Sequence, residues 1–501
     1  MVKELNDLAH FIKTSVWRDE ALLAAFSGAE PELLELYHIL WHKNLGTDEA
    51  AAKAAGWSLS AYKIRARRLR KCLRDMAVLF DDEKARANAM VKNQVEGILD
   101  TAIMNLLHAR GYRHAPPAIA KRLLRRGIDY DAPVFAAEAL GVLKETAKDM
   151  PGGEKQFAAY NRLYWEYRAH ADAEARAADC FQWADLPGLR KRSDRRQFLE
   201  HTRQRLEALA PFKGKTPSYL FHLHYFTVRI HFLLESGDYE GALRCCDEAI
   251  AWFVGRRYPA AGRLAMFHYK KVPAYILLER FEAGEAAALA GLDYAPDGSD
   301  EFFQAYEMYF CLAMYAGEYE QALDIFQTVS LHKRFSQLQG PLHEIWQILG
   351  AYLFLACRFG NLPLPEKSLP VFKSQRFANE MQVFNRDKDG MNVAILVAHL
   401  LLQLLEGKTD QLLERIEALD KYRERYLGYP EAERAGLFVK VLTLLPKVNF
   451  SSVTFQKKAA PLLRKMSALP RRMTNPAREP EIIPFENLAE MIAKWLAANR
   501  L

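Results

Sequence analysis

The sequence predicts an all-α protein: an α-solenoid of antiparallel helix pairs with a period of about 40 residues, behind an N-terminal helical unit. The stretch LLESGDYEGAL, residues 233–243, returns as MYAGEYEQAL, residues 314–323. In each copy an apolar helical pattern stops at a glycine, Gly237 or Gly317, and a second pattern begins shortly after it. Glycine is the usual residue just past a helix end because it adopts a left-handed conformation at little cost. Recurring units of this kind are typical of stacked helix pairs.

Further copies of the turn are expected at a similar spacing. In one copy Glu279 takes the glycine position and Phe281 the tyrosine position, and in another Cys357 and Phe359 take these positions. A weaker copy stops at Gly407. We therefore expect helix pairs to turn near residues 237, 279, 317, 357 and 407.

These stretches resemble the tetratricopeptide repeat family over about residues 219–420. The resemblance is carried by small and large anchor residues of the turns and helices, namely Gly237, Tyr239, Ala242, Ala249, Gly317, Tyr319, Ala322, Phe326, Trp346, Leu349 and Gly350. The sequence departs from the family in its longer period, in Arg229 and Ile230, and in the missing closing proline. The general layout also resembles a group of uncharacterised helical proteins from Bacteroidota.

The resemblance implies a concave groove lined by the first helix of each pair. Transferred to this sequence, the lining residues are His224, Thr227, His231, Glu235, Tyr269, Gln304, Glu307, Glu344 and Gln347. This set is polar and mildly acidic, so we expect a protein or peptide partner that presents a neutral or basic segment. The function expected from it is a non-catalytic scaffold for protein–protein interaction.

Neither a metal site nor catalysis is expected. His224, His231 and Glu235 share one helical face, but seven residues of straight helix span about 10 Å, too far for the two histidines to bind one ion. A His and a Glu one turn apart more often form a surface pair. The sequence also contains no HExxH or GxSxG motif and no Gly-rich phosphate loop after a strand-like run. We expect no enzyme activity and no cofactor.

The amino-acid composition restricts the class of protein only loosely. The chain has 501 residues, 50% of them hydrophobic, which is enough for more than one compact unit. Its net charge of +7 fits an ordinary solvated surface. The six cysteines form no CxxC pair, and no run of eighteen apolar residues or signal sequence occurs. We expect a cytoplasmic protein with unpaired thiols and no membrane contact.

Residues 1–113 are expected to form the N-terminal helical unit and to contain a helix-turn-helix. We predict a helix from Pro31 to Lys43, a short helix capped by Thr47 and stopped at Gly56, and a long helix capped by Ser60. The long helix runs to about Phe80 and is amphipathic. Its apolar face consists of Tyr62, Ala66, Leu69, Leu73, Met76 and Phe80.

The opposite face of the long helix is basic, with Lys63, Arg67, Arg70, Lys71 and Arg74. One interpretation places these cations on nucleic-acid phosphates, and the protein would then be a transcriptional regulator whose repeats act as a sensor. The other interpretation is a solvated face, or a face docked on acids of the same unit. Charge and turn spacing alone leave both open.

Three further segments complete the predicted organisation: a helical connector at 114–200, the repeats at 201–420 and a C-terminal helical cap at 421–501. The connector carries two cationic runs, KRLLRR at 121–126 and RKRSDRR at 190–196. The final helix, Phe485 to Ala498, places Leu488, Ile492 and Leu496 on one face, which we expect to cover the exposed end of the solenoid.

Overall fold

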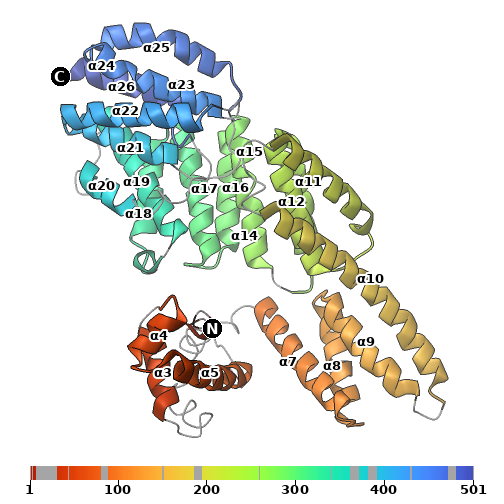
Figure 1. Cartoon of the computed structure of the whole chain (residues 1–501). Coiled ribbons are helices and arrows are strands. Elements are labelled where there is room, and N and C mark those ends of the chain that lie inside the picture. Colours follow the sequence, from red (N-terminus) through yellow and green to blue (C-terminus); the bar gives the residue numbers. More distant parts are fainter. Residues whose placement is uncertain are drawn as a thin grey trace. The chain divides into compact units, whose positions relative to one another are not determined.

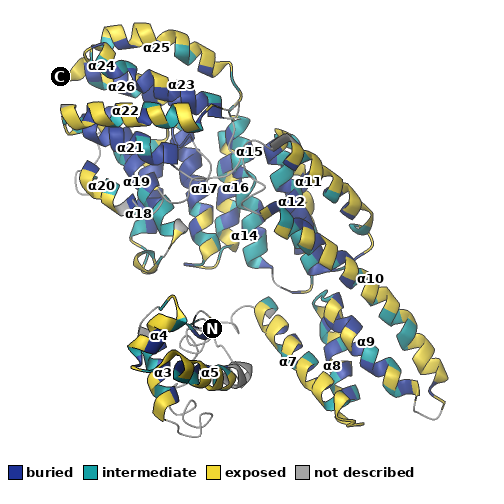
Figure 2. Cartoon of the chain, in the orientation of Figure 1, coloured by how far each residue is buried: buried dark blue, intermediate teal, exposed yellow. Residues whose placement is uncertain are grey.

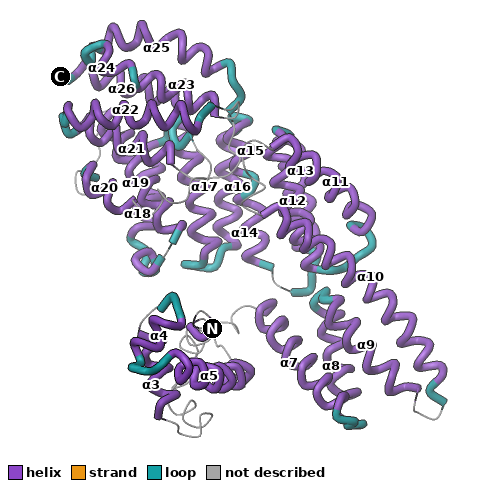
Figure 3. Tube along the Cα trace, viewed as in Figure 1, coloured by secondary structure: helices purple, strands orange, loops and turns teal. Residues whose placement is uncertain are grey.

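The computed structural model is all-helical (Figure 3). It describes residues 2, 4–6, 31–42, 45–79, 89–148, 152–185, 195–258, 260–338, 340–360, 372–381, 392–428, 432–471 and 481–499. Within these ranges the secondary structure consists of α-helices and short 3-10 helices, with no strand. The predicted all-α class is therefore confirmed.

The chain divides into two compact units. Unit 1 comprises residues 1–172 and 257–259, and unit 2 comprises residues 173–256 and 260–501. The boundary falls inside the long helix α10 (Glu154–Asp185). This division does not address the four segments expected from the sequence, which stay a prediction.

Three described helices of unit 1 all contact one another: α3 (Pro31–His42), α4 (Asp48–Ala54) and α5 (Leu59–Leu79). The predicted cap of α4 is confirmed, because the Thr47 hydroxyl accepts a hydrogen bond from the Ala50 N–H. The predicted cap of α5 is wrong. The Ser58 hydroxyl accepts from the Ala61 N–H at 3.2 Å, whereas Ser60 already lies in the first helical turn.

The apolar face of α5 packs into the core of this three-helix group. Tyr62, Ala66, Leu69 and Leu73 are each 0% exposed and lie against side chains of α3 and α4. Figure 2 shows the buried and exposed faces of these helices. The predicted apolar face is thus confirmed as far as Leu73, while the side chain of Met76 and all of Phe80 lie outside the described residues.

The rest of unit 1 contains α7 (Ala89–Ala109), α8 (Ala115–Asp129), α9 (Pro133–Lys148) and the first part of α10. Two prolines stand in the first turn of α8, where a missing N–H removes no helical hydrogen bond. The KRLLRR run lies on α8, and two of its four cations pair with acids of α7. Arg122 contacts Asp100 at 2.5 Å, and Arg126 contacts Glu96 at 2.5 Å. The side chains of the RKRSDRR run lie outside the described residues.

Unit 2 consists of helices that pack in chain order, each on the next long helix (Figure 1). Its described helices are the second part of α10, α11 (Arg195–Leu209), α12 (Tyr219–Ser236), α13 (Tyr239–Val254), α14 (Ala261–Tyr269), α15 (Val272–Leu277), α16 (Phe281–Tyr294), α17 (Asp300–Ala316), α18 (Tyr319–Ser330), α19 (Pro341–Gly360), α20 (Ser374–Glu380), α21 (Asn392–Leu405), α22 (Thr409–Tyr426), α23 (Glu433–Leu442), α24 (Leu444–Lys447), α25 (Ser452–Ser467) and α26 (Phe485–Ala498).

Four of the five predicted turns are present. Gly237, Gly317 and Gly407 have φ of 85°, 82° and 66°, and Glu279 has φ of 56° at the position where the other turns have glycine. The turn predicted at Cys357 is wrong, because α19 continues to Gly360 and buries Cys357 in the core. Apart from Arg358, the residues from Leu353 to Phe359 are apolar. None of them favours the left-handed region, so the helix does not stop there.

The described helices from α15 to α26 share one hydrophobic core. Trp346 of α19 belongs to this core and is 0% exposed. Gly350 on α19 allows a close approach, since a Cβ atom built there would lie 2.7 Å from the Phe326 ring of α18. Leu488, Ile492 and Leu496 of α26 are buried as predicted. In addition to α25, α26 contacts α19, a contact that the sequence did not predict.

Candidate functional site

The predicted groove residues of α14 and α17 come together. The Tyr269 hydroxyl of α14 donates a hydrogen bond to Gln304 Oε1 of α17 at 2.7 Å. Glu307 lies one turn further along α17, is 5% exposed, and acts electrostatically on Tyr269. Burial raises the pKa of the Glu307 carboxyl to about 8, so this side chain is largely protonated at pH 7.

The predicted groove residues of α12 are largely engaged by neighbouring side chains. The His224 ring stacks on Phe181 of α10 at a centroid distance of 4.9 Å, and burial lowers its pKa. His231 lies 3.9 Å from Glu235, whose side chain is only 7% exposed. Thr227 between them is partly exposed. These groups therefore interact with their own unit, and the acid among them is shielded.

The remaining predicted groove residues, Glu344 and Gln347, are partly exposed on α19. Burial raises the pKa of Glu344. Seven of the nine predicted residues are thus at least partly exposed, and the two buried ones are the acids Glu235 and Glu307. The surface is polar, but it is less acidic than the sequence alone indicated.

Two charged neighbours of this surface were not among the predicted residues. Arg263 on α14 acts electrostatically on Tyr219 and His224 of α12, and Glu301 on α17 acts on Tyr269. The two side chains add one cation and one anion to the polar surface of α12, α14 and α17. Their signal in the sequence was weak, because a single Arg near a helix start and an acid in a first turn are both common.

The basic face of α5 divides into two groups. Lys63, Arg67 and Lys71 are exposed. Arg70 is partly exposed and contacts Glu4 at 3.3 Å. The side chain of Arg74 lies outside the described residues. The interpretation that acids of the same unit dock on this face therefore holds for Arg70. Among the described residues the three exposed cations have no such acid, and the expected acids Asp81, Asp82 and Glu83 lie outside the described residues.

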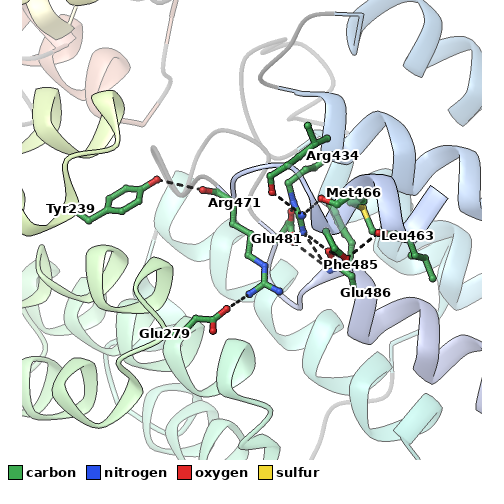
Figure 4. Close-up of polar contacts among 11 residues, drawn as sticks. Tyr239, Glu279, Arg434, Leu463, Met466, Arg471, Glu481, Phe485 and Glu486 are labelled. Atoms are coloured by element: carbon green, nitrogen blue, oxygen red, sulfur yellow. Dashed lines mark hydrogen bonds and ion pairs between the residues drawn. The ribbon is translucent and has the colours of Figure 1, made fainter. Parts of the chain in front are cut away.

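A buried ion-pair network fixes the start of α26 (Figure 4). The Arg434 guanidinium on α23 donates to both carboxylate oxygens of Glu481 at 2.5 and 3.0 Å, and to Glu486 at 3.0 Å. It also donates to the Met466 carbonyl oxygen at 2.6 Å. Burial alone would raise the pKa of Glu486, but hydrogen bonds from Arg434 lower it below the ordinary value. The network satisfies a charged group that is 7% exposed.

Arg471, which lies in the chain between Met466 and Glu481, contacts residues at two of the turns between helices. Its carbonyl oxygen accepts a hydrogen bond from the Tyr239 hydroxyl at 3.4 Å, and its guanidinium lies 3.0 Å from Glu279 (Figure 4). Further along, Trp495 of α26 packs edge-on against Phe359 of α19. The C-terminal segment is thus attached at several separate points to helices and turns that lie far earlier in the chain.

The described residues contain no group of three or more His, Cys, Asp and Glu side chains placed to hold a metal ion. None of the six cysteines is joined to another in a disulfide, and five of them are buried. Among the helices that the structure describes, none combines the length and the apolar character needed to cross a bilayer.

Comparison with known proteins gives no relative. No protein-family model, no curated protein and no solved structure matches the chain. The resemblance to tetratricopeptide repeats and to helical proteins of Bacteroidota therefore stays a prediction.

Proposed function

We propose that unit 2 is an α-solenoid of antiparallel helix pairs that binds a polypeptide segment along its first helices, as a non-catalytic interaction scaffold. The chain-ordered packing of the helices supports this proposal. The left-handed residues at 237, 279 and 317 also support it, because they recur at steps of 42 and 38 residues. Contacts from α14 to α17 and from α17 to α19 bring successive first helices next to one another.

The hydrogen bond from Tyr269 to Gln304 is the observation that carries the proposal. It joins the first helices of two successive pairs and so brings lining side chains of both helices together. Hydroxyl and amide groups on this surface can donate to and accept from the peptide groups of an extended segment. Glu307 is mostly protonated at pH 7 and Glu235 is shielded, which favours a neutral segment over a strongly basic one.

The thiols of unit 2 support binding rather than nucleophilic chemistry. Burial raises the pKa of Cys180 to about 11 and that of Cys245 to about 12. The thiolate, which is the nucleophilic form, is therefore scarce at neutral pH for both residues.

A charged triple variant tests this proposal. Arginine in place of Thr227, Gln304 and Gln347 puts three long cations on the proposed binding surface. The matched control places arginine at Thr328, Gln337 and Gln411, which are exposed and lie outside the first helices. Both variants add the same charge and start from the same residue types.

We expect a polypeptide that co-purifies with the unmodified chain to be retained by the control variant and lost from the first-helix variant. Loss of the partner from both variants would show that added charge, and not position, decides binding. Retention by both would contradict the assignment of the binding surface. Circular dichroism of each variant checks that the helices are intact.

A further inference from the structure

The helices α4 and α5 are joined by a turn whose conformation is fixed at both ends. Gly56 has φ of 69°, and the Trp57 N–H donates to the Ala52 carbonyl oxygen at 2.9 Å, which closes the end of α4. The Ser58 hydroxyl then caps α5. With α3 packed against both, these helices form a compact helix-turn-helix.

The rotation of α5 about its own axis is also fixed. Its apolar face, with four side chains at 0% exposure, is locked into the core of α3 and α4. The opposite face must therefore point to solvent. On that face Lys63, Arg67 and Lys71 recur at steps of four residues and form a cationic row about 12 Å long. The stretch from Leu59 to Arg74 contains no acidic residue.

Not all cations of α5 are available to a ligand. Arg65 donates to Glu32 at 2.7 Å and lies over the Trp57 ring at 4.7 Å, and Arg70 contacts Glu4. Lys63, Arg67 and Lys71 have no carboxylate partner among the residues that the structure describes. Arg65 thus lies on another side of α5, whereas Arg70 shares the basic face with the three unpaired cations and is held by Glu4.

We propose that this helix-turn-helix binds duplex DNA, with α5 in the major groove and Lys63, Arg67 and Lys71 on backbone phosphates. The major groove admits an α-helix, and the second helix of such a motif is the one that enters it. Exposed Ser60 and Ile64, near the start of α5, would then face the base edges, where hydroxyl and apolar contacts are made. Together with the binding surface proposed for unit 2, this would make the chain a regulator that joins DNA to a polypeptide partner.

A duplex fits this surface better than a lipid bilayer does. An amphipathic helix binds a bilayer by inserting its apolar face. In α5 that face is buried in the protein's own core, and only Leu59 and Ile64 are exposed large apolar residues in its described part. The ligand contacts of α5 must therefore be made mainly by its cations, which is the usual source of affinity for nucleic acid.

The test measures binding of the full chain to a fluorescent duplex of about 25 base pairs by anisotropy, over a range of salt concentrations. One variant carries Lys63→Gln, Arg67→Gln and Lys71→Gln. The matched control carries Lys121→Gln, Arg125→Gln and Lys155→Gln, which removes the same charge from exposed positions on α8 and α10. All six side chains are exposed, so folding should be preserved in both.

We expect the unmodified chain to bind the duplex at low salt, and the α5 variant to bind it roughly 10- to 100-fold more weakly at about 0.1 M salt. The slope of log affinity against log salt should fall by about 0.9 for each phosphate that the variant no longer neutralises, and the control should keep its slope. No binding by the unmodified chain at low salt, or equally weakened binding in both variants, would overturn the proposal.

Two further binding experiments, one with polyglutamate and one with lipid vesicles, test whether duplex DNA is the ligand of α5. Polyglutamate that displaces the duplex at equal charge concentration would show a general polyanion surface. Binding to vesicles of anionic lipid that depends on the α5 cations, without duplex binding, would identify a membrane surface instead. Either result would overturn the DNA assignment. Neither result would contradict the binding surface proposed for unit 2, which is tested by a different set of variants. Those arginine variants of the first helices leave α5 unchanged and should bind the duplex normally.

Discussion

Replacing Arg434 with methionine should destabilise unit 2 by about 3 to 5 kcal/mol, the range found when one partner of a buried ion pair is removed. The substitution leaves Glu481 and Glu486 without their cation in a site where Arg434 and Glu481 are each 7% exposed. It also leaves the Met466 carbonyl oxygen without the Arg434 donor.

The control for Arg434→Met is Arg203→Met. Arg203 on α11 also contacts two carboxylates, those of Glu200 and Glu207, each at 2.6 Å, but the pairs are exposed to solvent. Exposed pairs contribute little to stability, so the unfolding midpoint should change little.

Hydrogen exchange of residues 485–498 gives a local readout of the same change. In Arg434→Met we expect exchange in α26 to become about 100-fold faster, because the network fixes the start of this helix. Equal exchange in the Arg434 and Arg203 variants would show that apolar packing alone holds α26 in place.

Replacing Glu307 with glutamine should stabilise the protein at pH 9 by about 3 kcal/mol or more, and change its stability little at pH 5. The pKa of this carboxyl is about 8 in the folded chain and 4.5 as its ordinary value. Between pH 4.5 and pH 8 the unfolded chain has lost the Glu307 proton while the folded chain still holds it. The free energy of unfolding of the wild-type chain therefore falls as the pH rises from 4.5 through 8. Glutamine lacks this proton equilibrium and keeps a neutral side chain of similar size.

Urea unfolding of Glu307→Gln and of the wild-type chain at pH 5 and pH 9 measures this difference. Glu320→Gln is the control, because Glu320 is exposed on α18 and its charge is already solvated. A gain for Glu307→Gln that is equal at both pH values would show that Glu307 does not titrate in this range.

Local sequence patterns predicted much of the helical structure. The final helix was expected from Phe485 to Ala498 and has these bounds, since its apolar residues recur at steps of four. The turn at Glu279 was found from its spacing although the residue is not glycine. Ser58 and Ser60 could not be separated as caps, because both are good capping residues and the choice depends on a turn that begins at Gly56.

Long-range contacts were much harder to predict. Arg434 precedes Leu437, Phe438 and Val441 on one buried face, and a charged residue on such a face signals a buried partner. The sequence does not say that the partners are Glu481 and Glu486, some fifty residues later. The groove residues were expected to be alike, yet neighbouring helices bury Glu235 and Glu307 and leave Gln304 exposed. Burial at this level depends on tertiary packing and is not encoded in local periodicity.

The proposed binding surface of unit 2 is tested most directly by photo-crosslinking. Benzoylphenylalanine is placed at position 304, an exposed position of the first helix α17, and in a separate chain at position 328, an exposed position of α18. If the first helices bind a polypeptide segment, irradiation in cells should attach one discrete polypeptide through position 304 and none through position 328. No adduct at position 304, or the same adducts at both positions, would contradict the proposed function.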